Sequence, residues 1–188
     1  MTRALRTSLP LAGVLAIPMA ALLSACAPTL GPPPPSAAAS PAPTFSGPAN
    51  FSAADFAWSQ RSGANIIAGK VAYKQGTVRY TCAGSAVVLT PETAWSSRRM
   101  AALYGATDRA ALPSDEVRAR TPRAPPGDAG PFVKRTSCDD ADQFAFGGLP
   151  DGAWYAITVV KPVGVTAPNI ALMKRVVVRG GRTVALGL

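Results

Sequence analysis

Short runs in which apolar and polar residues alternate dominate residues 53–188, and Gly, Pro and Asp separate these runs. Successive side chains of an extended strand point to opposite faces, so this alternation indicates half-buried strands. The segments that fit are Ile67–Tyr73, Thr77–Cys82, Ser85–Leu89, Phe132–Ser137, Gln143–Phe146, Ala153–Val160, Leu172–Arg179 and Arg182–Leu186. The pattern predicts an all-β fold, a seven- to eight-stranded antiparallel β-sandwich.

The last two predicted strands are joined by Arg179-Gly180-Gly181-Arg182. Two adjacent glycines can adopt the positive φ angles that a tight hairpin turn requires. Val176 and Val178 would face the core from the first strand, and Val184 and Leu186 from the second. The sequence therefore predicts a C-terminal hairpin.

One segment interrupts the alternating pattern. Thr90 suits an N-cap, Pro91 the first helical position, and Gly105 can end a helix, so we expect a short helix over Pro91–Tyr104. Residues 106–131 are rich in Arg, Pro, Ala and Asp, which predicts a long loop. Loops of this length in compact domains are usually functional or disordered.

The inserted segment is also where we expect a partner surface, because the strands are committed to the core and to pairing. Its arginines outnumber its acidic residues by six to five, which favours shape-dependent docking with modest salt sensitivity. The candidate contact residues are Trp95, Arg98, Arg99, Arg118, Arg120 and Arg123. The alternatives are a solvated loop without a partner and, for Trp95 with Met100 and Leu103, packing on the sheet.

Residues 1–25 have the order of charged and apolar residues that is typical of a secretory signal. Arg3 and Arg6 precede the apolar run Leu9–Leu23, which prolines interrupt and which is shorter than the roughly 20 residues of a spanning helix. The run ends in Leu23-Ser24-Ala25-Cys26, which resembles the lipobox. The resemblance implies cleavage before Cys26 and attachment of diacylglycerol and acyl chains to it. The alternative is an ordinary secretory signal that happens to contain a cysteine.

Residues 26–52 are dominated by Pro, Ala, Ser and Gly and contain no charged residue. Such a composition cannot build a core, and its prolines favour an extended chain. We expect a disordered tether that lifts one domain, residues 53–188, off a membrane. Ala27 follows the cysteine in place of the Asp that resembles an inner-membrane retention signal in enteric-type bacteria, so the expected location is the outer membrane.

Thr136–Tyr155, with the sequence TSCDDADQFAFGGLPDGAWY, resembles the T-D-x-x-G-x-F-x-F-x-x-L-P-x-G-x-Y block of carboxypeptidase regulatory-like domains. These domains belong to the transthyretin-like or prealbumin-like group, which also includes the Cna-B repeats. Ala68–Val71 and Gly84–Leu89 are similar to the G-x-V and A-x-V-x-L strands of that family. The resemblance implies a sandwich that serves as an accessory, spacing or adhesive module. Asp142 or Gln143 stands where the family commonly has Gly, and the long insertion is a second departure.

Cys82 and Cys138 are the thiols that remain once Cys26 is lipidated. They lie at the ends of predicted strands in an oxidising compartment, which predicts a disulfide. A reduced or redox-active pair is the alternative. The absence of C-x-x-C spacing and of any histidine argues against redox catalysis.

The chain contains no histidine, which excludes Ser-His-Asp and Cys-His catalysis and histidine metal ligation. Asp139, Asp140, Asp142 and Asp151 could begin a calcium site or act as glycosidase carboxylates. No EF-hand loop surrounds them, and aspartates in turns commonly bond to their own backbone. We therefore expect no cofactor, no metal and no enzymatic activity.

Removal of the signal leaves 17 basic against 10 acidic residues. They are scattered, which argues against a nucleic-acid partner. We expect a non-catalytic outer-membrane lipoprotein whose sandwich is a structural, adhesive or partner-docking module. Its partners would be membrane lipid, through acylated Cys26, and an envelope protein or polysaccharide. The alternative is a periplasmic carbohydrate-binding or envelope-assembly factor, although Trp58, Trp95 and Trp154, which could stack on sugars, fall in different elements.

Overall fold

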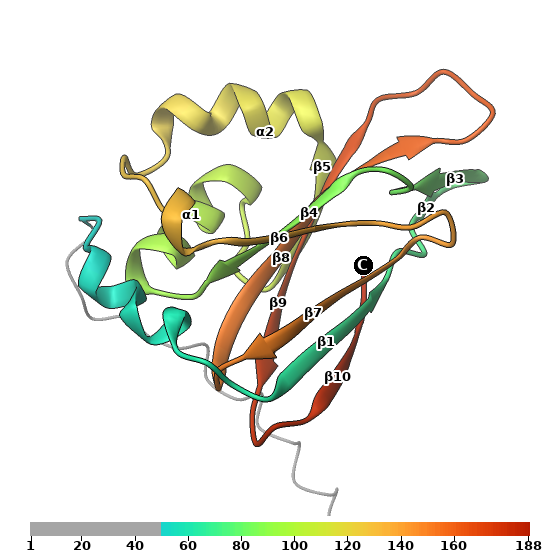
Figure 1. Ribbon diagram of the computed structural model, residues 1–188. Coiled ribbons are helices and arrows are strands. Elements are labelled where there is room, and N and C mark those ends of the chain that lie inside the picture. The colour runs from blue at the N-terminus through green and yellow to red at the C-terminus, as the bar shows by residue number, and fades with distance from the viewer. Residues whose placement is uncertain (1–49) are drawn as a thin grey trace, which may run out of the picture. The chain divides into compact units, whose positions relative to one another are not determined.

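The computed structural model describes residues 50–188, so the predicted signal, Cys26 and the tether up to residue 49 lie outside the described residues. The elements follow in the order η1 (Ala53–Gln60), β1 (Asn65–Lys70), β2 (Lys74–Gln75), β3 (Val78–Thr81), β4 (Ala86–Pro91), α1 (Ala94–Tyr104), β5 (Arg109–Pro113), α2 (Ser114–Arg120), η2 (Thr121–Arg123), η3 (Gly130–Phe132), β6 (Lys134–Ser137), β7 (Gln143–Leu149), β8 (Gly152–Pro162), β9 (Ile170–Val178) and β10 (Thr183–Gly187) (Figure 1). No helix between residues 50 and 188 is long and apolar enough to cross a membrane.

The strands form two sheets, so the all-β sandwich prediction is confirmed (Figure 1). The smaller sheet has the order β10-β1-β7. The larger sheet is built around β8, which pairs with β9 along one edge and with β3 and β4 along the other. Strand pairing is antiparallel throughout except between β1 and β10. Strands β2 and β5 are the two that the sequence pattern did not predict.

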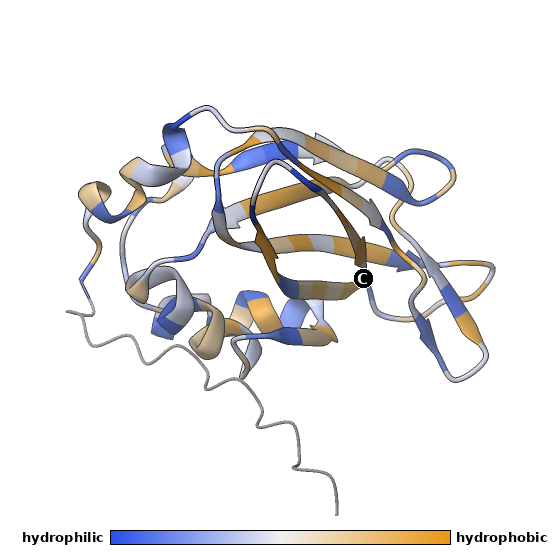
Figure 2. Ribbon diagram, turned by 90° about the horizontal axis from the view of Figure 1, so that it is seen from below, coloured by the Kyte–Doolittle hydropathy of each residue, from blue (hydrophilic) through white to orange (hydrophobic). Residues whose placement is uncertain are grey.

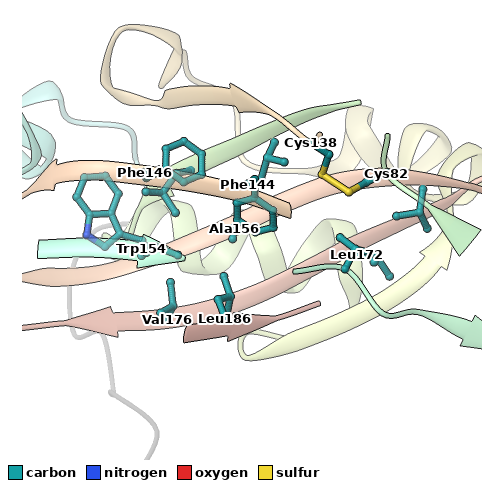
Figure 3. Close-up of a cluster of buried hydrophobic side chains, with 14 of the residues drawn as sticks. Cys82, Cys138, Phe144, Phe146, Trp154, Ala156, Leu172, Val176 and Leu186 are labelled. Atoms are coloured by element: carbon teal, nitrogen blue, oxygen red, sulfur yellow. A yellow bond between two sulfur atoms is a disulfide. The ribbon is translucent and has the colours of Figure 1, made fainter. Parts of the chain in front are cut away.

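Side chains from the inner faces of both sheets meet in one hydrophobic core. Hydrophobic residues run along the strands of both sheets (Figure 2). In the close-up, Phe144 and Leu186 of the smaller sheet lie with Ala156, Leu172 and Val176 of the larger (Figure 3). Burial alternates residue by residue along β1, because only every second side chain faces the opposite sheet. The half-buried strand predicted from the alternation in Ile67–Tyr73 is therefore confirmed for β1.

The predicted disulfide joins Cys82, just after β3, to Cys138, just after β6. The two Cα atoms are 5.7 Å apart, and both residues are buried within the core. The bridge lies beside Phe144 at one end of the core (Figure 3). It therefore fastens the turn after β6 to the end of β3.

The prediction of a C-terminal hairpin is wrong, although both strands form. β9 belongs to the larger sheet, whereas β10 runs parallel to β1 in the smaller one. Gly180 and Gly181 both have a φ of 67°, but here they let the chain cross between the sheets as an arch. Asp151 Oδ1 accepts from the Gly180 N–H at 3.0 Å, and Asn65 Oδ1 accepts from the Arg182 N–H at 3.0 Å. Alternation could not separate the two cases, because a hairpin and an arch bury the same side chains.

The predicted helix forms but begins later than expected. α1 starts at Ala94 rather than Pro91, and its N-cap is Thr93 rather than Thr90. Thr93 Oγ1 accepts from the Ser96 N–H, and Ser96 Oγ accepts from the Thr93 N–H, which is a reciprocal capping box. Thr90 and Pro91 instead continue β4, where they pair with β8. The predicted helix end at Gly105 is confirmed.

The prediction of a long loop over residues 106–131 is also wrong. Arg109–Pro113 forms β5, which pairs with β9 and extends the larger sheet, and α2 follows directly. The helical insertion covers the face of the larger sheet that points away from the core. Met100 and Leu103 of α1 pack there with Tyr155, Met173 and Ala124. The insertion is therefore an integral layer, and the predicted packing of Met100 and Leu103 on the sheet is confirmed.

Candidate functional site

Trp95, one of the predicted contact residues, is not available to a partner. Its side chain is only 2% exposed, and its ring makes edge contacts with the rings of Phe51 and Phe56. Its Nε1 donates to the Pro126 carbonyl at 2.8 Å. Trp95 holds the segment before β1 against α1, which corrects its assignment to the contact surface.

The predicted contact arginines fall into two sets. Arg99 stacks on the Trp95 ring and donates to the Pro125 carbonyl at 2.7 Å, and Arg120 donates to the Leu103 carbonyl at 3.2 Å. These two fasten the insertion to itself. Arg118 and Arg123, by contrast, are exposed on α2 and η2, and Arg98 is half-buried on α1. Only part of the predicted set can therefore meet a partner.

Asp139 and Asp151, two of the aspartates that could have begun a calcium site, accept hydrogen bonds from other groups of the domain. Asp139 Oδ1 accepts from the N–H groups of Ala141 and Gln143, at 2.9 and 2.7 Å. Asp151 accepts from the Asn65 side chain at 2.9 Å, in addition to Gly180, and these hydrogen bonds lower the pKa of its carboxyl. No group of three or more potential ligands within residues 50–188 could hold a metal ion.

Trp58 and Trp154 do not offer a platform for sugars. Trp154 is fully buried, and the Trp58 ring meets it edge-on with centroids 5.0 Å apart. The hypothesis that the tryptophans stack on a sugar is therefore not supported by their placement. The aromatic side chains that do line an open hollow are those of Tyr73 and Tyr80.

Two adjoining hollows share Tyr73, at the end of the sandwich where β2 and the C-terminus lie (Figure 1). The first has a volume of about 310 Å³ and the second about 480 Å³, which is the size range of small-molecule sites. The first is lined by Lys70, Val71, Ala72, Tyr73, Lys74, Arg79, Tyr80, Asp140, Ala141 and Asp142. The second is lined by Tyr73, Arg109, Ala110, Ala111, Leu172, Met173, Lys174, Gly187 and Leu188.

The wall of the first hollow is fixed by Asp142, in the turn between β6 and β7. Asp142 has a left-handed φ of 60°, and its Oδ1 accepts from the Cys82 N–H at 2.7 Å and from the Thr81 hydroxyl. Its backbone carbonyl accepts from the Val71 N–H at 2.9 Å. This turn is thereby tied to β3, to the end of β1 and, through Cys138, to the disulfide. The hollow is preformed rather than dependent on a mobile loop.

The ring of Tyr73 packs against the buried ring of Tyr80. Its ring meets that of Tyr80 edge-on, with centroids 5.4 Å apart, and Tyr80 is 2% exposed. The Tyr80 hydroxyl donates to Gln75 Oε1 at 3.3 Å. Tyr73 itself is half-buried, so part of its ring remains open to the hollows.

The second hollow follows from the C-terminal arch. Because β10 pairs with β1 and not with β9, the sandwich stays open between β10 and the β5–β9 edge. Ala111, Leu172 and Leu188 line the second hollow, and Lys174 Nζ donates to the Gly187 carbonyl across the opening at 2.8 Å. The second hollow therefore combines apolar side chains with two cations, Arg109 and Lys174.

Tyr73 was not predicted as a site residue, because the alternating pattern includes it in the strand Ile67–Tyr73, whereas β1 ends at Lys70. The sequence did contain a pattern that could have indicated this site. Each side of the β2–β3 turn carries an aromatic residue next to a cation, namely Tyr73 with Lys74 and Tyr80 with Arg79. No Ser, Thr, Cys or His lines either hollow of the described domain. The arrangement offers an aromatic ring, apolar side chains and several charged groups, which are features of small-molecule binding sites.

No protein-family model and no curated protein matches this chain. A solved crystal structure from Pseudomonas aeruginosa, named as a candidate carbohydrate binding protein, has a similar fold. The TM-score is 0.53 and the sequence identity 20%, and the match covers 73% of this chain and 97% of the other. At this identity the likeness establishes a shared sandwich fold.

Proposed function

We propose that this protein is a non-catalytic carbohydrate-binding lipoprotein of the bacterial cell envelope. Acylation of Cys26 would hold the protein in the outer membrane, and the Pro-rich residues after Cys26 would carry the sandwich away from the lipid surface. The sandwich would present the hollows around Tyr73 to polysaccharide of the envelope.

The hollows around Tyr73 are the observation that carries this proposal. A partly open aromatic ring provides an apolar face for the C–H groups of a sugar ring, and charged side chains around it provide partners for hydroxyl groups. The turn containing Asp142 preforms one wall, which lowers the ordering cost of binding. The name of the structural neighbour supports carbohydrate as the ligand class.

The proposed membership of the carboxypeptidase regulatory-like group also fits a non-catalytic role. In that family a glycine commonly stands before the first Phe of the F-x-F pair, and here Asp142 takes the left-handed φ that glycine tolerates best. Its side chain supplies the compensating hydrogen bond to Cys82. The departure from the family pattern therefore has a physical explanation.

A binding assay with two Tyr73 variants tests the proposal. The full-length protein, extracted in detergent, is titrated with soluble polysaccharides that include neutral and acidic chains. We expect binding to at least one chain, retained by Tyr73→Phe and weakened about tenfold or more by Tyr73→Ala, with unchanged thermal unfolding. Absence of binding to every chain, or equal binding by both variants, would overturn the proposal.

A second candidate function is docking of an envelope protein on α2. The observation that favours it is that α2 has no buried residue, so Arg118 and its neighbour Arg123 of η2 face solvent. Deletion of the whole insertion would not test this surface alone, because it would also remove β5, which pairs with β9 in the larger sheet. The double variant Arg118→Glu/Arg123→Glu should instead lose any crosslinked envelope partner and remain folded; an unchanged set of partners would exclude this surface.

A further inference from the structure

We infer that the ligand of the Tyr73 site is an acidic polysaccharide whose sugar rings carry carboxylates, that is, a polyuronate. This inference rests on the proposed function and narrows its ligand class. It follows from the charges that line the two hollows, from which of these charges are already paired, and from their placement on both sides of Tyr73.

The linings of the two hollows are strongly basic. Their cations are Lys70, Lys74, Arg79, Arg109 and Lys174, against the carboxylates of Asp140 and Asp142 and the chain-terminal carboxylate of Leu188. One of these carboxylates, that of Asp142, is already paired with other groups of the domain. Asp142, whose side chain is 10% exposed, accepts hydrogen bonds from Thr81 and Cys82 and faces Arg79 Nη1 at 3.6 Å. The hollows therefore present an excess of positive charge to a ligand.

Most of these cations have no carboxylate partner in the described domain. Among residues 50–188, no carboxylate lies within ion-pair distance of Lys70, Lys74, Arg109 or Lys174. Lys174 reaches only a backbone carbonyl, that of Gly187. Several unpaired like charges around one site repel each other, and an anionic ligand relieves that repulsion.

The placement of the cations matches a repeating anion better than a single one. Lys70 and Lys74 line the first hollow, Arg109 and Lys174 line the second, and Tyr73 lies in both. A sugar ring on Tyr73 would leave the carboxylates of the neighbouring rings facing cations on either side. A neutral polysaccharide would accept hydrogen bonds from these cations through its hydroxyl groups, but it would leave their charges unneutralised and would gain no electrostatic attraction from their convergence.

Two ligands with the same sugar ring test the inference. The full-length protein in detergent is titrated by calorimetry with polygalacturonate and with its fully methyl-esterified form, which keeps ring and linkage but removes the charge. We expect at least tenfold tighter binding of the acidic chain, with affinity that falls as salt rises. Equal binding of both forms would overturn the inference of an acidic ligand but leave the proposed carbohydrate binding intact. If the protein bound neither form and no other polysaccharide, the proposed function would be overturned as well.

Matched charge variants separate the site from a general attraction of a basic protein. Lys70→Gln/Lys74→Gln/Arg109→Gln removes three exposed charges from the hollows, and Arg123→Gln/Arg135→Gln/Arg182→Gln removes three exposed charges elsewhere. We expect the first set to weaken polygalacturonate binding about tenfold and the second to change it less than about twofold. Equal losses in both sets would overturn the inference. So would equally tight binding of inorganic polyphosphate or of phosphatidylglycerol vesicles, since these anions lack a uronate ring.

Discussion

Gly69 on β1 lies directly across from Phe144 on β7, and the phenyl ring occupies the space that a side chain at residue 69 would need. A Cβ atom on Gly69 would come within 2.0 Å of Phe144 Cζ. Phe144 is 5% exposed and is held among core residues, so its ring has little room to move away. The glycine of the G-x-V strand is therefore required by the first Phe of the F-x-F pair.

Replacement of Gly69 by Ala should destabilise the domain. The added methyl group overpacks the core, and we expect a loss of about 2 kcal/mol or more in the free energy of unfolding. Gly147→Ala on β7 is the matched control, because a Cβ atom there meets open space, and it should change stability by less than about 0.5 kcal/mol. Urea unfolding measures both. A similar stability for the two variants would contradict this account of Gly69.

The strands and their inward faces could be predicted because period-two burial is a local property. Phe144 and Phe146 face the core as their alternation indicates, and the strand that includes Trp154 forms as predicted. Sheet membership could not be predicted in the same way. Asn65 and Asp151 hold the chain after β9 as an arch, and they lie far from Gly180 in the sequence.

The candidate site was harder to predict than the fold. Tyr73, Arg109 and Leu188 come together only because β5 joins β9 and β10 joins β1, and neither pairing has a local sequence signal. The predicted contact residues lie in a segment that was expected to be a short helix followed by a long loop. Trp95 shows why that choice failed: the segment is a packed layer, and its largest apolar side chain lies inside.

Glu92 and Arg175 form the most buried ion pair of the described domain, with side-chain exposures of 6% and 28%. Arg175 Nε donates to Glu92 Oε1 at 2.7 Å and Nη2 to Oε2 at 2.6 Å, and the Tyr155 hydroxyl donates to Oε1 at 2.9 Å. Because Glu92→Gln leaves a partly buried guanidinium without its counter-charge, we expect a loss of about 2–3 kcal/mol in the free energy of unfolding.

The exposed pair of Asp115 with Arg118 on α2 provides the control for that experiment. Asp115→Asn should change stability by less than about 0.5 kcal/mol, because solvent-exposed ion pairs contribute little. Chemical unfolding of both variants under the same conditions makes the comparison. If Glu92→Gln cost no more stability than Asp115→Asn, the pair of Glu92 with Arg175 would not have the structural role assigned to it.

Loss of the Cys82–Cys138 disulfide should lower the stability markedly. The two residues are 56 positions apart, and the chain-entropy model gives about 4 kcal/mol for a loop of that length. The double variant Cys82→Ser/Cys138→Ser should therefore melt well below the parent protein. Two free thiols in protein isolated without reductant, or an unchanged melting temperature in the variant, would contradict the prediction.

Asp151 should make stability depend on pH in the acid range. The Asn65 side chain, first, and the Gly180 N–H, second, hydrogen-bond its carboxylate and lower its pKa in the folded state. The stabilisation is therefore fully present above the unfolded-state pKa of about 3.9 and is lost as pH falls through the lower folded-state value. Asp151→Asn, which cannot ionise, should differ most from the parent above pH 4. A stability difference that stays constant down to pH 2 would refute this assignment.

Replacement of Cys26 by Ser should abolish lipidation. In the proposed lipidation, a diacylglyceryl group would be attached through the cysteine sulfur. Each buried methylene of such acyl chains contributes about 0.8 kcal/mol, so several chains together would hold the protein on a membrane. The parent protein should incorporate labelled fatty acid and sediment with membranes, whereas Cys26→Ser should remain unlabelled and retain its signal. Ala27→Asp is the companion variant: it keeps the thiol and should still label, but it should move to the inner membrane where an Asp retention signal operates. If Cys26→Ser still labels and matures, the lipobox interpretation is wrong, and the proposed site around Tyr73 would belong to a protein released from the membrane.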